Sequence, residues 1–355
     1  MKFIVKKIYI VFFLYILLFL KSVALAKDNK ILYTRENISN YFLGSISLNQ
    51  GFDRQAFKYL KKVQQLKDKH YKFNIEFIRT LILLEKFDQA FAFSKSVWTE
   101  DEFFFEADLI LGLEQFIKKD YAKAEKHFQR LNKISRYNLF FDDFIGNILI
   151  AWSRASQNKK NESFKSIKKI KNPYSHLKKI QEGFLQCYFE LDTTQKSFEE
   201  IIKNEDYNFS RYHFFLANYF LSKNKITDAK NTIEIGMKES SSNLLLKQSE
   251  DFLIKGEINK MMTFYDCKNP KDSIAEFFYV IANLYASEKN YQLSNFYLKI
   301  SLFLNKKFLT NKLLLAENYY YQKKYNKSKN AYLTSKSIGE VYSWYASKSI
   351  ASILL

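Results

Sequence analysis

The sequence predicts an all-α protein built as a solenoid of antiparallel helix pairs. Residues 105–132 contain two helical runs with apolar residues at three- and four-residue spacings, and a short polar break separates them. Small residues of this stretch recur every 34 residues along the chain. The 355 residues include only 8 Gly and 2 Pro, too few for a β-rich fold with many tight turns.

The first helical run of this stretch carries Leu111 and Gly112, and the second carries Tyr121, Ala124 and Phe128. Glycine inside a helix costs roughly 1 kcal/mol relative to alanine, so Gly112 needs a packing reason. We expect Gly112 and Ala124 to lie where the two helices touch. One such pair cannot bury its apolar faces alone, so the pairs must stack on one another.

The repeat is visible as Ala56, Ala90 and Ala124, each 34 residues from the next, and as Leu-Gly at 43–44 and 111–112. Leu-Gly in the first helix and Ala-x3-Phe in the second, at a period of 34, resemble the tetratricopeptide repeat (TPR). The resemblance extends from about Asn37 to Leu355 and is closest to exported multi-TPR proteins of Gram-negative bacteria. It implies a right-handed superhelical α-solenoid that binds proteins in its concave groove.

The register of the repeat predicts the organisation of the chain. A five-residue extension after residue 136 places the small residue of the fourth pair at Ser163. The expected segments are a signal peptide (1–26), a leader (27–36), three TPR units in strict register (37–136), three divergent units (137–240), a degenerate repeat or hinge (241–274), two further TPR units (275–342) and the first helix of an apparently truncated repeat (343–355).

The N-terminus has the features of a secretory signal peptide. Lys2, Lys6 and Lys7 form a basic region, residues 8–20 are an unbroken apolar run, and residues 24–26 read Ala-Leu-Ala, a signal-peptidase pattern. Thirteen helical residues span about 20 Å, less than the roughly 30 Å core of a bilayer. We therefore expect cleavage and export, to the periplasm if the cell is Gram-negative. The alternative is an uncleaved anchor in the inner membrane, the only membrane contact expected.

The chain is basic, with 56 Lys and Arg against 37 Asp and Glu, a formal net charge of +19. Such a balance raises the possibility of nucleic-acid binding. No Arg-rich stripe, zinc-ligand spacing or RNA-binding signature accompanies it. We expect the lysines to cover the polar faces of amphipathic helices and predict no specific nucleic-acid partner.

No catalytic or cofactor site is predicted. The four histidines lie far apart in the sequence, and none stands at a metal-ligand spacing. The sequence also lacks a Gly-rich phosphate loop and a G-x-S-x-G motif. Cys187 and Cys267 are 80 residues apart, about two repeats, so two free thiols are expected; the alternative is a disulfide formed in an oxidising periplasm.

The concave groove of such a solenoid is lined by residues of the first helix of each pair (helix A) that point away from the second helix (helix B). Aromatic and amide side chains there suit a peptide, because rings supply buried area and amides hold backbone groups. The alternative interpretation, equally favoured, is that these aromatic side chains pack between adjacent helices. Some TPR domains hold the C-terminal carboxylate of a peptide with lysine and asparagine on the first helix of a pair. Phe214 and Tyr279 stand at the lysine positions here, so the sequence does not favour such a carboxylate clamp. The predicted groove residues are Arg211, Phe214, Asn218, Glu276, Tyr279, Asn283, Leu313, Glu317 and Tyr320.

These observations favour a non-catalytic scaffold of the cell envelope that binds a peptide or protein segment. One alternative is an accessory subunit of an envelope assembly, secretion or cell-wall machine. Another is the TPR part of a longer enzyme whose catalytic domain follows Leu355.

Overall fold

A computed structural model describes residues 33–134, 144–170, 175–203 and 209–355. Its regular structure is helical, and the described residues contain no strand. The all-α prediction is therefore confirmed. The predicted signal peptide lies outside the described residues. Among the described residues, no helix combines the length and the hydropathy of a membrane span.

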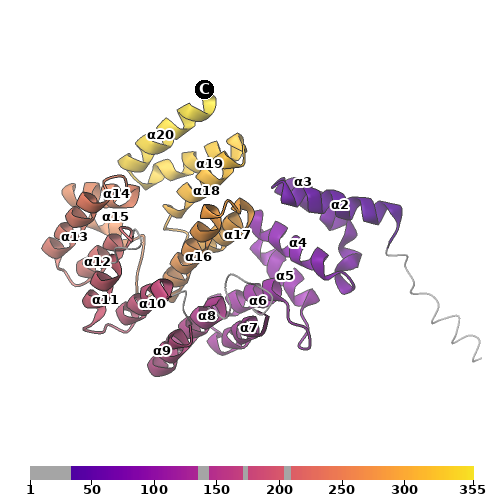
Figure 1. The fold of residues 1–355 in the computed structure, drawn as a ribbon, viewed down its shortest axis with the longest axis horizontal. Helices are drawn as coiled ribbons and strands as arrows, with labels where there is room; N and C mark the ends of the chain where they lie inside the picture. The colour runs from indigo at the N-terminus through magenta and orange to yellow at the C-terminus, as the bar shows by residue number, and fades with distance from the viewer. Residues whose placement is uncertain (1–32, 135–143, 171–174, 204–208) are drawn as a thin grey trace, which may run out of the picture. The chain divides into compact units, whose positions relative to one another are not determined.

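The chain divides into two compact units, residues 1–77 and 78–355. Helices follow one another as pairs, each with a helix A and a helix B, coloured from indigo to yellow in Figure 1. The pairs in chain order are α2 (Arg35–Asn49) with α3 (Asp53–Leu60) and its extension η2 (Lys61–Asp68), α4 (Tyr71–Leu83) with α5 (Phe87–Val97), α6 (Phe105–Ile117) with α7 (Tyr121–Ile134), α8 (Phe144–Ala155) with α9 (Lys160–Lys168), α10 (Ser175–Tyr188) with α11 (Thr194–Ile202), α12 (Tyr212–Ser222) with α13 (Ile226–Glu239), α14 (Leu244–Ile254) with α15 (Ile258–Met262), α16 (Pro270–Ser287) with α17 (Tyr291–Leu304), and α18 (Asn311–Tyr321) with α19 (Tyr325–Ser335). The short η4 (Lys336–Ile338) and α20 (Glu340–Leu354) follow.

Each turn between helix A and helix B contains one residue with a left-handed backbone, the conformation that commonly ends an α-helix. In the first three turns this residue is Gly51, Glu85 or Lys119, with φ of 68°, 59° and 64°, at steps of 34 residues. The next is Asn158, 39 residues further on, which equals the repeat plus the predicted five-residue extension. The later turns use Glu190, Asn224, Gly256, Lys289 and Lys323.

The small residues lie at the predicted close contact between paired helices. A Cβ atom at Gly112 would lie 2.3 Å from a ring carbon of Phe128, and one at Gly44 would lie 2.6 Å from the Leu60 side chain. Both contacts join residues 16 positions apart, one on helix A and one on helix B. Ala124 is fully buried. The fourth pair follows the same rule, because the Ser163 hydroxyl donates to the carbonyl of Ala151 at 2.9 Å.

Within the second unit, the pair α16–α17 packs against helices that lie much earlier in the sequence. Figure 1 shows α16 beside α8 and α10. The rings of Phe144 on α8 and Phe277 on α16 have centroids 5.6 Å apart, and the rings of Phe87 and Phe303 stack at 3.7 Å. Helix pairs therefore also pack against pairs that are distant from them in the sequence.

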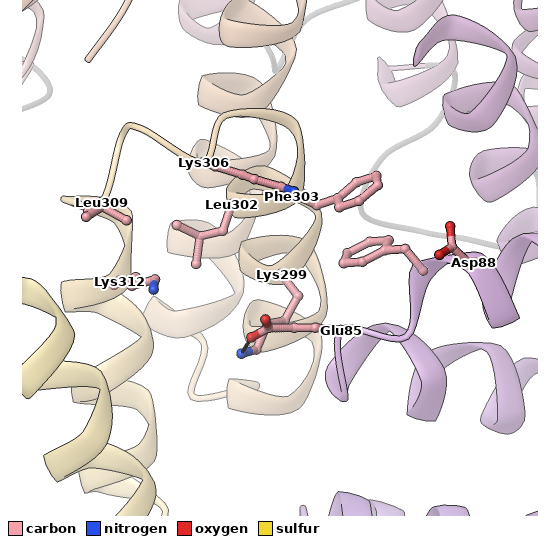
Figure 2. Close-up of a pocket in the computed structure, with 9 residues that line it drawn as sticks. Glu85, Asp88, Lys299, Leu302, Phe303, Lys306, Leu309 and Lys312 are labelled. Carbon is pink, nitrogen blue, oxygen red and sulfur yellow. Dashed lines mark hydrogen bonds and ion pairs between the residues drawn. The ribbon is translucent and has the colours of Figure 1, made fainter. Parts of the chain in front are cut away.

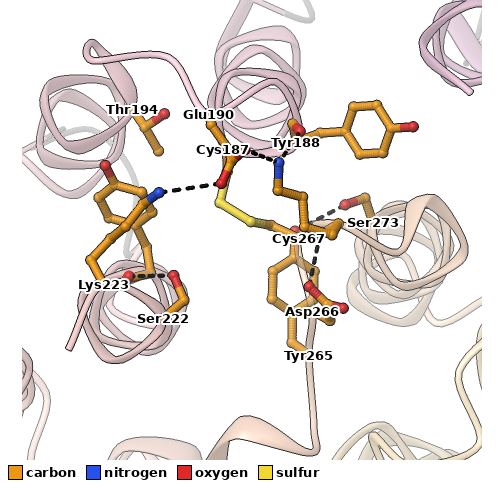
Figure 3. Close-up of a disulfide and its surroundings, with 12 residues drawn as sticks. Cys187, Tyr188, Glu190, Thr194, Ser222, Lys223, Tyr265, Asp266, Cys267 and Ser273 are labelled. Carbon is orange, nitrogen blue, oxygen red and sulfur yellow. Dashed lines mark hydrogen bonds and ion pairs between the residues drawn. A yellow bond between two sulfur atoms is a disulfide. The ribbon is translucent and has the colours of Figure 1, made fainter. Parts of the chain in front are cut away.

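A disulfide between Cys187 and Cys267 corrects the prediction of two free thiols. Their Cα atoms are 5.8 Å apart, and Figure 3 shows the bond between the end of α10 and the segment that precedes α16. The Lys268 ammonium donates to the Tyr188 carbonyl at 3.2 Å beside it. The prediction assumed that distant repeats stay apart. Because α16 packs on α10, 80 residues of sequence separation become a side-chain contact.

Candidate binding pockets

An ion pair between distant helices anchors the region where the groove residues were predicted. Arg211, at the start of α12, donates to both carboxylate oxygens of Glu276 on α16, at 2.7 and 2.8 Å. A further bond of 2.9 Å joins the guanidinium to the Asn311 side-chain oxygen. The Arg211 guanidinium also lies 4.0 Å from the centroid of the Tyr279 ring, a cation–π contact. These contacts fix the Tyr279 ring in one place.

A pocket of about 620 Å³, here named the α10–α16 pocket, opens beside this ion pair. Its volume falls in the range of ligand pockets, about 300–1,000 Å³. It brings together three of the predicted groove residues, Arg211, Tyr279 and Asn283, of which Asn283 is exposed. The rest of the lining is His176, Leu177 and Ile180 on α10, Phe209, Ser210 and Tyr212 at the start of α12, Ser240 and Asn243 before α14, and Val280 and Leu284 on α16.

Two predicted groove residues are instead part of the protein interior, which corrects the prediction for them. Phe214 and Glu276 are fully buried. The Phe214 ring stacks on Phe308, with centroids 5.5 Å apart, and Glu276 is held by Arg211. The repeat pattern predicts that these helix A positions face an open groove. They are covered because α16 and the segment before α18 pack onto α12.

Asn218 lines a different pocket, of about 370 Å³, next to the disulfide. Its side chain is 5 % exposed, and its Nδ2 atom has no hydrogen-bond partner in the described part of the chain. Lys223 and Lys268 stand at this pocket, and each forms an ion pair with Glu190. The structure therefore separates Asn218 from the other predicted groove residues.

Two of the three predicted residues on α18, Leu313 and Glu317, contact α20. Leu313 packs against a buried cluster that contains Ala346. The Glu317 carboxylate accepts a hydrogen bond from the Tyr345 hydroxyl at 3.3 Å, and burial raises the pKa of Glu317 above its ordinary value. Tyr320 remains 40 % exposed. Of the three, only Tyr320 presents a large surface to a partner.

The α10 side of the pocket was not predicted from the sequence. His176, Leu177 and Ile180 belong to a different repeat from Tyr279 and carry no motif. The one signal that α10 and α16 meet is the presence of two cysteines in a chain predicted to be exported, since disulfides are favoured in such compartments.

The paired helices, the 34-residue steps between the first left-handed turns and the glycine contacts define a TPR-like helical-repeat protein. No protein-family model and no curated protein matches the chain. Among solved structures 25 chains match. One is the crystal structure of the APC/C hetero-tetramer Cut9–Hcn1, with 11 % identity and a TM-score of 0.28, covering 84 % of this chain and 72 % of that chain. The assignment of the repeat rests on the helix pairs themselves.

Proposed function

We propose that the protein is a non-catalytic scaffold that binds a segment of a protein partner in the α10–α16 pocket. The observation that carries this proposal is the meeting of Arg211 at the start of α12 with Tyr279 and Asn283 from α16 in one pocket, although the two helices belong to different repeats. Arginine and tyrosine are enriched among the residues that dominate binding energy at protein interfaces. A pocket that already fixes such side chains loses little conformational entropy on binding.

The chemistry of the pocket suits peptide recognition. Leu177, Val280 and Leu284 supply apolar wall, and Leu284 is 37 % exposed. The exposed amide of Asn283 offers both a donor and an acceptor to a peptide backbone. Arg211 and Glu276 neutralise each other, so neither is free to act as an acid or a base. An extended segment with one or two apolar side chains fits these features.

The proposed location is the cell envelope, with the alternative role of an accessory subunit in an envelope machine. Two features support export: the signal-peptide pattern of residues 1–26 and the disulfide between Cys187 and Cys267. Disulfides persist in the periplasm and are rare in the reducing cytosol. An uncleaved N-terminal anchor would place the same pocket on the outer side of the inner membrane.

A displayed peptide library selected on the purified full chain tests the proposal and requires no candidate partner. Selected peptides are then measured by fluorescence anisotropy against Asn283→Arg, which places a bulky charged side chain at the pocket. Asn326→Arg is the matched control, because Asn326 is exposed on α19 and lies outside the pocket. We expect Asn283→Arg to weaken binding at least tenfold, about 1.4 kcal/mol, and Asn326→Arg to leave it unchanged.

Raising the salt concentration from low to physiological should weaken these peptides far less than it weakens a nucleic-acid complex. Selected peptides that bind wild type and Asn283→Arg equally would contradict the proposed pocket. A library that yields no saturable binder would contradict the peptide-binding function.

A further inference from the structure

A second pocket, independent of the one above, contains an unusual concentration of lysine. Its volume is about 440 Å³, and it lies between the start of α5 and the helices α17 and α18 (Figure 2). Lys299, Lys306 and Lys312 line it together with Leu302, Phe303 and Leu309. Glu85, Phe87 and Asp88 complete the lining from the other side. We call it the lysine pocket.

The positive charge of this pocket is only partly compensated. The Lys299 ammonium pairs with the Glu85 carboxylate at 2.5 Å. The ammonium groups of Lys306 and Lys312 form no ion pair with any described residue. The Lys306 ammonium lies 5.9 Å from the centroid of the Phe303 ring. In the view of Figure 2 the three lysines surround Leu302, and Asp88 lies beyond the aromatic side of the pocket. Three ammonium groups against the two carboxylates of Glu85 and Asp88 leave a local excess of positive charge.

Lys312 is the residue for which this excess matters most, because it is half-buried. Burial lowers the pKa of its ammonium; Glu85 opposes this shift and Lys299 adds to it. The helices α5 and α18 also begin at the pocket, with Phe87 and Lys312 in their first turns. A helix N-terminus carries a partial positive charge, which adds to that of the lysines. The lysine ammonium groups and the two helix N-termini would all attract an anion bound in the lysine pocket.

The apolar part of the pocket restricts which anions fit. Phe87 and Phe303 stack with centroids 3.7 Å apart, and with Leu302 and Leu309 they supply the apolar lining of the pocket. The geometry points to a site for an amphiphilic anion, whose oxyanion head lies near the lysine ammonium groups and whose aliphatic body lies against Leu302 and the phenyl rings. The head is a carboxylate, as in a fatty acid, or a phosphate monoester. Either takes charge-assisted hydrogen bonds from ammonium groups.

Isothermal titration calorimetry on the purified full chain tests this site with four probes. Octanoate and octyl phosphate combine an anionic head with an apolar body, octanol has the body alone, and inorganic phosphate has the head alone. We expect saturable 1:1 binding of at least one octyl anion, at least tenfold tighter than that of octanol or phosphate. Tighter octanoate binding identifies a carboxylate ligand, and tighter octyl phosphate binding identifies a phosphoryl ligand.

Lys312→Met removes the charge but keeps an unbranched side chain one atom shorter, and should weaken the binding of the preferred anion at least tenfold. Lys336→Met is the matched control, since Lys336 is exposed on η4 and lies outside the pocket. If Lys312→Met does not fold, acetylation of wild-type lysines by acetic anhydride replaces it. The bound anion should then protect Lys306 and Lys312 but not Lys336. Equal binding of octanol and the octyl anions, an equal effect of both variants, or equal protection of all three lysines would overturn the site.

Discussion

The Arg211 guanidinium holds the Glu276 carboxylate through two hydrogen bonds, of 2.7 and 2.8 Å, although 65 residues separate them in the chain. The Glu276 side chain is fully buried, and 17 % of the Arg211 side chain is exposed. Burial opposes the charge on Arg211, but the Glu276 carboxylate outweighs it and raises the pKa of the guanidinium further. Burial raises the pKa of the Glu276 carboxyl group, and the charge and hydrogen bonds of Arg211 oppose that shift. The ion pair joins the sixth helix pair to the eighth.

Breaking this ion pair should destabilise the second unit. Glu276→Gln leaves the Arg211 charge without its counter-charge, and removing one partner of a buried ion pair costs about 3–5 kcal/mol. Urea unfolding followed by circular dichroism measures the free energy of unfolding. Glu288→Gln is the control, because Glu288 is exposed at the end of the same helix, and it should change stability by less than about 0.5 kcal/mol. Similar losses for both variants would show that Glu276 has no special role.

Gly112 should tolerate no larger residue. Its added Cβ in Gly112→Ala would overlap the buried ring of Phe128 at 2.3 Å, so we expect a loss of about 1–3 kcal/mol from overpacking. Gly183→Ala is the matched control, since its nearest neighbour is the flexible end of Ile201 at 3.1 Å. That variant should be close to neutral, because alanine favours a helix over glycine by about 1 kcal/mol. Thermal unfolding compares the two, and a larger loss for Gly183→Ala would contradict the assigned contact.

The repeat was predictable from the sequence because each of its signals is local. The contact between Gly112 and Phe128 joins residues 16 positions apart and recurs at Gly44 and Leu60. Periodic contacts of this kind leave a periodic pattern of small and large residues. The five-residue shift before the fourth pair was predictable for the same reason, since Ser163 stands where the pattern requires a small residue.

The candidate site was only partly predictable, because its contacts are not periodic. The repeat pattern places Arg211, Phe214 and Glu276 on the open side of helix A. The repeat pattern does not indicate that α16 packs against α10 and α12. The contacts that join them link residues 65 or 80 positions apart, and these separations do not follow the 34-residue period. Asn283 is exposed and lines the α10–α16 pocket. Phe214 and Glu276 lie deeper and are buried in the protein interior.

Asp272 should make the stability of the folded chain depend on pH. Its side chain lies in the first turn of α16 and is 7 % exposed. Burial raises the pKa of its carboxyl group from 3.8 to about 7, against the opposing hydrogen bond from the Asp266 backbone N–H. Between about pH 4 and 7 the folded state therefore binds a proton that the unfolded state does not. This contribution to stability is complete below about pH 4 and is lost as the pH rises towards 7.

Asp272→Asn removes the titrating group and should flatten this dependence, by at most about 1.4 kcal/mol per pH unit in that range. Urea midpoints at several pH values between 4 and 8 measure the difference from wild type. Asp228→Asn controls for the loss of a carboxylate in the first turn of another helix, because Asp228 is exposed on α13. A constant difference between wild type and Asp272→Asn across this range would show that the carboxyl group does not titrate there.

The disulfide should stabilise the second unit by restricting its unfolded state. Closing a loop of 80 residues lowers the chain entropy of the unfolded ensemble, and native disulfides typically contribute about 2–4 kcal/mol. The double variant Cys187→Ala, Cys267→Ala should lose stability of that size in non-reducing urea unfolding. Dithiothreitol should destabilise wild type by a similar amount and leave the double variant unchanged, which separates the bond from other effects of the reductant.

Amide hydrogen exchange then locates the effect. The disulfide holds the segment before α16 against the end of α10, so its removal should increase exchange first in α16 and its preceding loop, residues 263–287. The first unit contains neither cysteine and serves as an internal control, with exchange in α2 and α3 expected to stay constant. Maleimide labelling of Cys187 and Cys267 in unreduced exported protein would contradict the disulfide. Uniformly faster exchange in both units would contradict a local role for it.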